Sequence, residues 1–115
     1  MLAVSTIYER SQQVGLLVMH ADGGAAALCP FFAKCDGVLV IDPRSEVYEF
    51  HSIEQRSAGA VCDMVLKTGA KRLICGFVSE PETRKLRAAG IDVRLGSCAC
   101  AVEDLAARFG ELPRA

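Results

Sequence analysis

The second half of the chain alternates between helix-like and strand-like segments, and this alternation restricts the fold more than any other feature. Residues 58–66 place their apolar side chains on one helical face, and Gly69 is expected to end that helix. Residues 72–78 form a continuous apolar run, which is typical of a central strand covered on both sides, and residues 91–95 form another core strand. Short connections between such segments require parallel strands joined by right-handed crossovers. The chain is therefore expected to be an α/β protein.

Two further helices complete this half. Ser79-Glu80-Pro81-Glu82 has the form of a capping box with proline in the first turn, so a helix is expected to begin there and to end at Gly90. A last helix is expected over residues 101–109, where Val102, Leu105 and Phe109 pack.

The first half adds antiparallel strands. Residues 15–21 predict a buried strand followed by a turn at Asp22-Gly23-Gly24, and residues 37–42 and 46–51 predict a hairpin with one solvated face. The expected domain spans residues 15–110 and contains a mixed, mostly parallel five-stranded sheet flanked by about three helices. Residues 1–14 are interpreted as an N-terminal extension, either a short edge strand or a disordered segment, and residues 111–115 as a C-terminal tail.

The length, net charge and cysteine count of the chain restrict the class of protein to which it can belong. With 115 residues and a net charge of −1, the chain has no basic stripe to favour nucleic acid and no apolar run long enough to span a membrane. The first ten residues lack the features of a secretory signal, so a cytoplasmic protein is expected. In a reducing compartment, six cysteines indicate metal binding or redox chemistry, or else act as small buried hydrophobes.

Position along the chain separates these cysteines. Cys62 lies on the apolar face of a predicted helix and Cys75 in the middle of an apolar strand, so both are expected in the core. The other four lie in turns or at strand ends: Cys29, Cys35, Cys98 and Cys100.

Ligands of open α/β sheets bind beyond the carboxyl ends of the parallel strands. If the first strand runs parallel to the later ones, residues 22–24, 77–80 and 96–100 line one rim of the sheet, with the segment 29–35 beside them. Cys98 and Cys100 also precede a helix, whose free N–H groups favour a thiolate. The spacings C-x5-C and C-x-C match no standard zinc motif. Two interpretations stay open: the four thiols converge as a ligand site, or they are unrelated loop cysteines.

The remaining candidate ligands carry less weight. His20 lies inside an apolar strand and is interpreted as a core histidine, whereas His51 ends the hairpin and is a weak candidate for the rim. Asp22 and Asp42 follow two strands, but no third acid stands in register to complete a two-metal nuclease centre.

Several short strings occur in an order that resembles the dinitrogenase iron–molybdenum-cofactor biosynthesis family, which includes NifX-like and NifB C-terminal-like proteins. They cover most of residues 15–110: Ala21-Asp22-Gly23-Gly24, Cys29-Pro30-Phe31-Phe32-Ala33-Lys34-Cys35, Val38-Leu39-Val40-Ile41-Asp42, Ala88-Ala89-Gly90-Ile91-Asp92-Val93, and Leu95-Gly96-Ser97 with Glu103-Asp104-Leu105. The resemblance implies a ribonuclease-H-like fold and a non-enzymatic protein that binds or carries an iron–sulfur or iron–molybdenum cluster or its precursor. Cofactor-assembly proteins and nitrogenase are the implied partners, and the oligomeric state is left open.

The chain departs from the family pattern where ligands are expected. The motif histidine is Phe31, which cannot ligate, and the motif glycine and arginine are Ala33 and Lys34. Cys29 stands where serine is usual, so we hypothesise that thiolates replace imidazole, since soft thiolates suit iron–sulfur species.

The predicted site has two groups of residues. The metal ligands are Cys29, Cys35, Cys98 and Cys100. The further cofactor-binding residues are Asp22, Gly23, Gly24, Phe31, Lys34 and Ser97, with the lysine offsetting the charge of a thiolate-bound cluster. Two alternatives use the same residues: a thiol–disulfide or redox-sensing protein, and a regulatory domain with a decayed site.

Overall fold

A computed structural model of the chain describes residues 13–20, 26–44 and 47–115. Most of the predicted N-terminal extension and the predicted turn at residues 22–24 lie outside these residues. In the part of the chain described, no helix is both long and apolar enough to cross a membrane.

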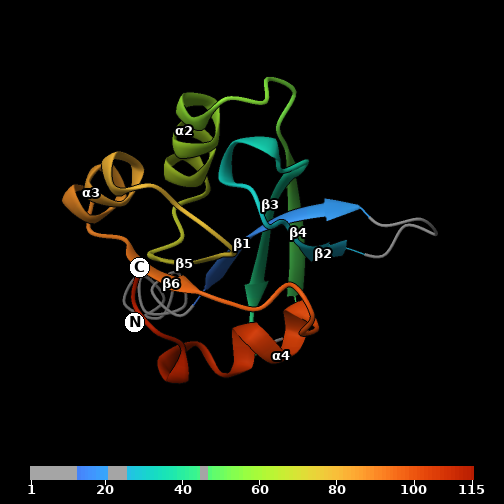
Figure 1. Cartoon of the computed structure of the whole chain (residues 1–115). Helices are drawn as coiled ribbons and strands as arrows, with labels where there is room; N and C mark the ends of the chain where they lie inside the picture. Colours follow the sequence, from blue (N-terminus) through green and yellow to red (C-terminus); the bar gives the residue numbers. More distant parts are fainter. Residues whose placement is uncertain (1–12, 21–25, 45–46) are drawn as a thin grey trace, which may run out of the picture.

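A mixed sheet forms the centre of the molecule (Figure 1). Its main strands lie in the order β4-β3-β1-β5-β6, and their bounds are β1 Val14–His20, β3 Gly37–Asp42, β4 Val47–Ser52, β5 Arg72–Cys75 and β6 Asp92–Leu95. A sixth strand, β2 (Ala26–Leu28), pairs antiparallel with the last residues of β1. β1 and β3 pair antiparallel with Leu16 opposite Leu39, and β3 and β4 form the predicted hairpin.

Parallel pairing is confined to β1, β5 and β6, as the strand–helix alternation requires. Leu16 of β1 lies opposite Ile74 of β5, and Cys75 lies opposite Leu95 of β6. The carboxyl ends of these three strands therefore lie at one rim of the sheet, which confirms the expected geometry.

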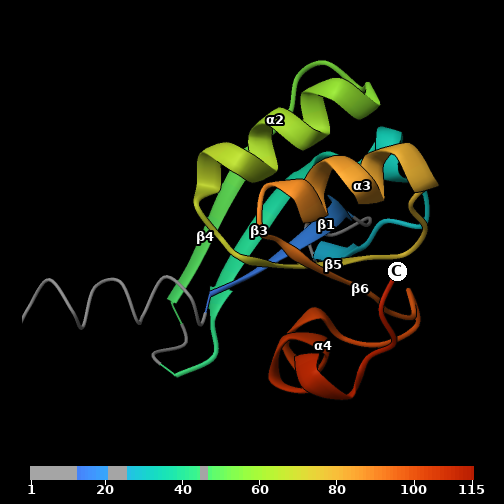
Figure 2. The same ribbon diagram turned by 90° about the vertical axis from the view of Figure 1, so that its left-hand side faces the viewer.

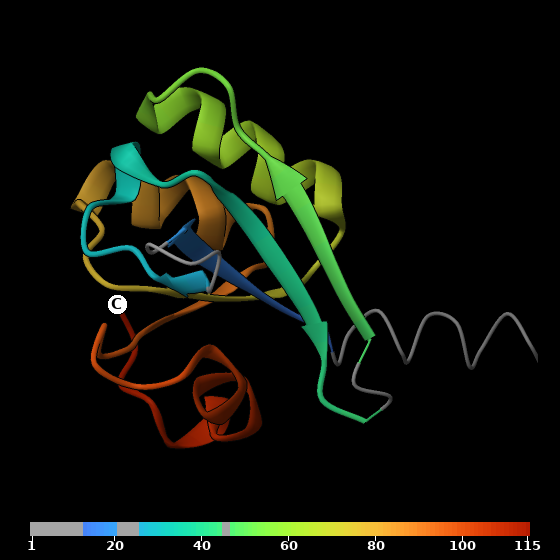
Figure 3. The same ribbon diagram turned by 90° about the vertical axis from the view of Figure 1, so that its right-hand side faces the viewer.

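Among the described residues, three α-helices cover the two faces of the sheet (Figures 2 and 3). α2 (Ala58–Thr68) and α3 (Glu80–Ala88) lie side by side on one face, and α4 (Val102–Ala107) lies on the other. Two 3-10 turns, η1 (Phe32–Lys34) and η2 (Phe109–Glu111), complete the described elements.

Local sequence explains where the helices begin and end. The Ser57 hydroxyl accepts a hydrogen bond from the Ala60 amide at the start of α2, and Gly69 ends this helix with a left-handed φ of 77°. α3 begins after Ser79 as predicted, but the capping box does not form because the Ser79 side chain makes no cap hydrogen bond. The backbone carbonyl of Ser79 instead accepts hydrogen bonds from the amide and the hydroxyl of Thr83.

The alternation of side chains along the strands creates a hydrophobic cluster on each face of the sheet. The α2/α3-side cluster includes Leu17, Val38, Val65, Leu73, Leu86 and Val93, and the α4-side cluster includes Leu16, Val18, Ile41, Ile74, Leu105 and Phe109. A single domain of 115 residues thus buries two apolar layers without disulfides, since all six cysteines are free.

Over the described residues, the structure confirms a single α/β domain with a mixed sheet and three α-helices, and it changes several details. The described sheet has six strands instead of five, and the last helix ends at Ala107. The C-terminal residues lie along β6, where the Leu95 amide bonds to the Pro113 carbonyl and the Ala115 amide to that of Val93. The core assignment of His20 is wrong, because its side chain is exposed and contacts the Phe50 ring on the hairpin.

Candidate functional site

The candidate site lies at the rim where β1, β5 and β6 end. The chain leaves β5 through residues 76–79 and β6 through residues 96–101, and the segment 29–36 closes the same end of the sheet. The Cys29 amide donates to the Leu17 carbonyl over 2.8 Å, and the Asp36 amide donates to the Val18 carbonyl over 2.8 Å. Both ends of this loop, which we call the 29–36 loop, are therefore fastened to β1.

Polar contacts hold the loop further. The Asp36 carboxylate accepts a hydrogen bond from the His20 amide over 2.9 Å and pairs with Arg56 over 2.5 Å. The Cys29 thiol donates to the Phe31 carbonyl over 3.2 Å, and the Lys34 amide donates to the same carbonyl over 3.0 Å. These bonds fold the loop inward and fix the direction of the side chains that follow.

Gly76 is the point where the two cysteine-bearing segments meet. A β-carbon on this residue would lie 2.8 Å from the Cys29 carbonyl oxygen, 3.0 Å from Pro30 Cα and 3.2 Å from Cys98 Sγ. Only glycine leaves room for this approach. The segments 29–35 and 97–100, predicted to share a rim, therefore both approach Gly76, just beyond the end of β5.

The Cys29 and Cys35 thiols face the core and not the rim surface. They are 3% and 0% exposed and belong to the α2/α3-side cluster with Cys75. Burial, with a smaller contribution from the nearby Cys29, raises the pKa of Cys35 to about 11. Burial and the neighbouring Cys35 raise the pKa of Cys75 to about 12. The two buried thiols Cys35 and Cys75 are thus protonated at neutral pH and act as small hydrophobes.

Cys98 and Cys100 have different surroundings. Cys98 is exposed, whereas Cys100 is half-buried against the α4-side cluster, on the face of the sheet opposite Cys29 and Cys35. The Ser97 hydroxyl accepts from the Ala99 amide over 3.2 Å and its carbonyl accepts from the Cys100 amide over 3.1 Å. Ser97 thus shapes the turn that presents Cys98.

The four predicted thiol ligands are not gathered in this conformation. Among the described residues, no three histidine, cysteine, aspartate or glutamate side chains are grouped so that they could hold a metal ion. The segments meet as predicted, but their side chains diverge, because Cys29 and Cys35 turn to one face of the sheet and Cys100 to the other. Their role as ligands stays a prediction, and so does that of Asp22, Gly23 and Gly24, which lie outside the described residues.

An apolar hollow opens at the same rim, next to the 29–36 loop. It encloses about 190 Å³ and is lined by Phe31, Phe32, Ala33, Ala58, Phe77, Ser79 and Glu82. The Phe31 and Phe77 rings are 59% and 64% exposed, which is unusual for adjacent aromatic side chains without a covering element. The Lys34 ammonium lies 5.6 Å from the centre of the Phe31 ring, a cation–π distance. We call this feature the aromatic hollow.

Sequence reasoning placed Phe77 at the rim but did not name it as a binding residue, and it missed Glu82. Residues 72–78 read as one apolar strand, but β5 ends at Cys75 and Phe77 turns outward. A glycine inside an apolar run marks a bend or a close backbone approach, and Gly76 was the available signal.

The chain resembles known structures over nearly its whole length. It is similar to the apo form of the orange protein from Desulfovibrio gigas, with 26% sequence identity, a TM-score of 0.77, and coverage of 91% of this chain and 93% of that one. It is also similar in fold to a putative NifB protein from Thermotoga, of the DUF35 family, with 19% identity, a TM-score of 0.65, and coverage of 89% and 91%.

No protein-family model matches the sequence, and no match to a curated protein was found. The similar structures show the fold of the chain, and they do not assign it to a family.

Proposed function

We propose that this protein is a non-enzymatic carrier of a metal–sulfur cofactor, an iron–sulfur or iron–molybdenum cluster species or a precursor, that binds at the sheet rim. The fold is shared with a protein described in an apo form and with a putative NifB protein. The observation that carries the proposal is the position of Cys98: an exposed thiol over Gly76, at the point that the 29–36 loop also approaches.

The kind of cargo is inferred from the small number of exposed metal-ligating side chains among the described residues of the rim. A bare metal ion needs several protein ligands, and the described residues supply no such group. A preformed cluster brings its own sulfide, so one thiolate from Cys98 can hold it, with Cys100 as a second ligand after a change of rotamer. Soft thiolates suit such species, and the Lys34 ammonium offsets their negative charge.

Few ligands also suit a carrier, which must release its cargo. The buried Cys29 and Cys35 become ligands only when the 29–36 loop opens, which costs the two backbone bonds to β1. We propose that these two thiols take part in that opened state, in which cargo passes to a cofactor-assembly protein or to nitrogenase.

Anaerobic reconstitution tests the proposal. The full chain is incubated with iron and sulfide, with and without molybdate, desalted, and assayed for iron, molybdenum, acid-labile sulfide and visible absorption. Bound metal and colour are expected for the wild type, with most of both lost in Cys98→Ser. Ala99→Ser, an exposed change in the same turn, is the matched control and should keep both.

Two results would contradict the proposal. Equal cluster content in the wild type and in Cys98→Ser would show that Cys98 is not a ligand, and the proposal would fail. Free thiols that oxidise reversibly in pairs, with no metal retained under any condition, would instead support the redox-sensing alternative.

A further inference from the structure

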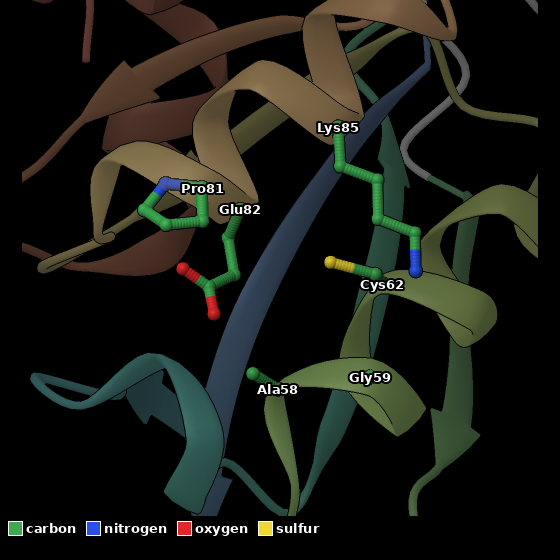
Figure 4. Close-up of a pocket in the computed structure, with 6 residues that line it drawn as sticks. All are labelled: Ala58, Gly59, Cys62, Pro81, Glu82 and Lys85. Atoms are coloured by element: carbon green, nitrogen blue, oxygen red, sulfur yellow. The ribbon is translucent and has the colours of Figure 1, made fainter.

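Glu82 carries a buried oxygen without a hydrogen-bond partner. It lies in the first turn of α3, and Figure 4 shows its carboxylate extending from α3 towards Ala58 at the start of α2. Its Oε2 atom is buried and accepts no hydrogen bond from the residues that the structure describes. Leaving such an atom unpaired destabilises the folded protein, because the atom has lost its hydrogen bonds to water. An unpaired buried oxygen of this kind requires an explanation.

The neighbouring cations are directed towards other acids. Lys85, one turn further along α3, lies 4.0 Å from the Asp63 carboxylate on α2. Arg84 pairs with Glu80 on the exposed side of α3. The protein's own charges near the start of α3 therefore leave Oε2 without a donor.

Glu82 stands between two adjoining hollows. With Ala58 it lines the aromatic hollow, and with Ala58, Cys62 and Lys85 it lines a groove of about 160 Å³ between α2 and α3 (Figure 4). On the side of the aromatic hollow, the surroundings of the carboxylate are almost entirely apolar. A ligand entering between the Phe31 and Phe77 rings would meet the Glu82 carboxylate among the residues that line the hollow.

We propose that the aromatic hollow is a binding site for a small flat organic ring that presents N–H donors along one edge, such as an amidine or an amino-substituted nitrogen heterocycle. When the ligand binds, the Glu82 carboxylate turns into the hollow, which exposes the buried Oε2, and its two oxygens accept paired N–H donors in a bidentate arrangement. The Phe31 and Phe77 rings contact the ligand ring through their faces or edges. A volume of about 190 Å³ admits a one- or two-ring compound and is too small for a larger ligand.

This site is separate from the proposed metal ligands, although it adjoins them. Phe77 follows Gly76, on which Cys98 rests, but no thiol lines the aromatic hollow. Cys98→Ser is therefore expected to keep ring binding while it loses the cluster. The experiment can therefore distinguish failure of ring binding from failure of the proposed cluster binding.

The test uses the full chain and two probes of the same ring size and opposite edge chemistry. Benzamidine presents two N–H donors and benzoate presents two acceptors, and backbone amide NMR signals are followed during each titration. Benzamidine should shift the signals of Phe31, Phe77 and Glu82 with a weak but saturable affinity, and benzoate should not. A parallel titration with phenylurea, which is neutral and presents two N–H donors along one edge, separates recognition of the donor edge from attraction of a cation; phenylurea should shift the same signals as benzamidine.

Three variants complete the design. Glu82→Gln keeps the side-chain shape but replaces one acceptor with a donor, and it should weaken benzamidine binding at least tenfold. Glu80→Gln, an exposed change in the same turn, is the matched control and should bind like the wild type. Phe77→Ala should also weaken binding, because it removes one wall of the aromatic hollow. Equal binding of benzoate, unchanged affinity in Glu82→Gln, or no shift up to the solubility limit of benzamidine would each overturn the proposal.

Discussion

Replacing Gly76 with alanine tests the arrangement on which the candidate site depends. The added β-carbon would lie 2.8 Å from the Cys29 carbonyl oxygen and 3.0 Å from Pro30 Cα, below the 3.4 Å at which ordinary contact begins. Both neighbours are backbone atoms of a loop that is hydrogen-bonded to β1, so neither can move away like a flexible side chain. The third neighbour, Cys98 Sγ, belongs to the segment proposed to hold the cargo.

The expected loss of stability in Gly76→Ala is estimated from the cost of overpacking. Forcing one methyl group into a tightly packed position costs about 1–3 kcal/mol, and the fixed backbone on one side favours the upper part of that range. For a domain of this size the cost corresponds to a decrease in Tm of roughly 5–15 °C. Because relaxation must separate the Cys98 turn from the 29–36 loop, cluster content should also fall when it is measured well below the melting temperature.

Thermal unfolding monitored by circular dichroism is the assay. Gly59→Ala is the matched control, since a β-carbon there meets nothing within 4 Å and the residue lies in the first turns of α2, where alanine is the better helix former. Its Tm should be unchanged or slightly higher. If Gly76→Ala melts with the wild type, the close approach of the two segments is absent and the site built on it is refuted.

The remaining predictions concern titration and thiol chemistry. At pH 8 the native protein should react with a thiol reagent at Cys98 first, because this thiol is exposed. The buried Cys35 and Cys75 should react only after unfolding; at pH 8 a pKa of about 11 leaves about one thousandth of Cys35 as thiolate, and the pKa of Cys75 is higher still. Rapid modification of Cys35 or Cys75 in the native protein would contradict their burial. Asp92 accepts two hydrogen bonds from Arg94, over 2.8 and 3.0 Å, and this contact lowers the pKa of the carboxyl. Its stabilisation is therefore present above the ordinary pKa of about 3.9 and is lost as the pH falls through the lowered value. Asp92→Asn should melt below the wild type at pH 7, with the gap closing below about pH 4, and a constant gap would show that the charge is not responsible.

The arrangement of the elements could be predicted from the sequence because it depends on local signals that the structure retains. Gly69 has the left-handed conformation that ends α2, and the apolar runs near residues 72 and 91 became neighbouring parallel strands. Strand β2 could not be predicted in this way. It has only three residues, two of them alanine, and it exists because the end of β1 is there to pair with it.

The direction of the cysteine side chains could not be predicted from their spacing in the sequence. Leu28 ends β2 on the α4-side face, so the next residue, Cys29, falls on the α2/α3-side face by simple alternation. That inference requires knowing that β2 exists. Cys35 turns inward because the neighbouring Asp36 amide bonds to Val18, a contact between residues eighteen apart in the sequence. Long-range hydrogen bonds of this kind leave no periodic trace in a sequence.

The distribution of thiols across the fold is compatible with the proposed carrier role, in which the rim would hold its cargo loosely. Four of the six cysteines are buried and serve as small apolar residues, so a count of cysteines overstates the number of available ligands. Of the residues that the structure describes, those exposed at the rim include the Cys98 thiol, the Lys34 ammonium and the rings of Phe31 and Phe77. A permanent metal centre would require a closed ligand set on rigid elements. An incomplete set on two loops, which meet only because Gly76 has no side chain, suits a cluster that must be picked up and passed on.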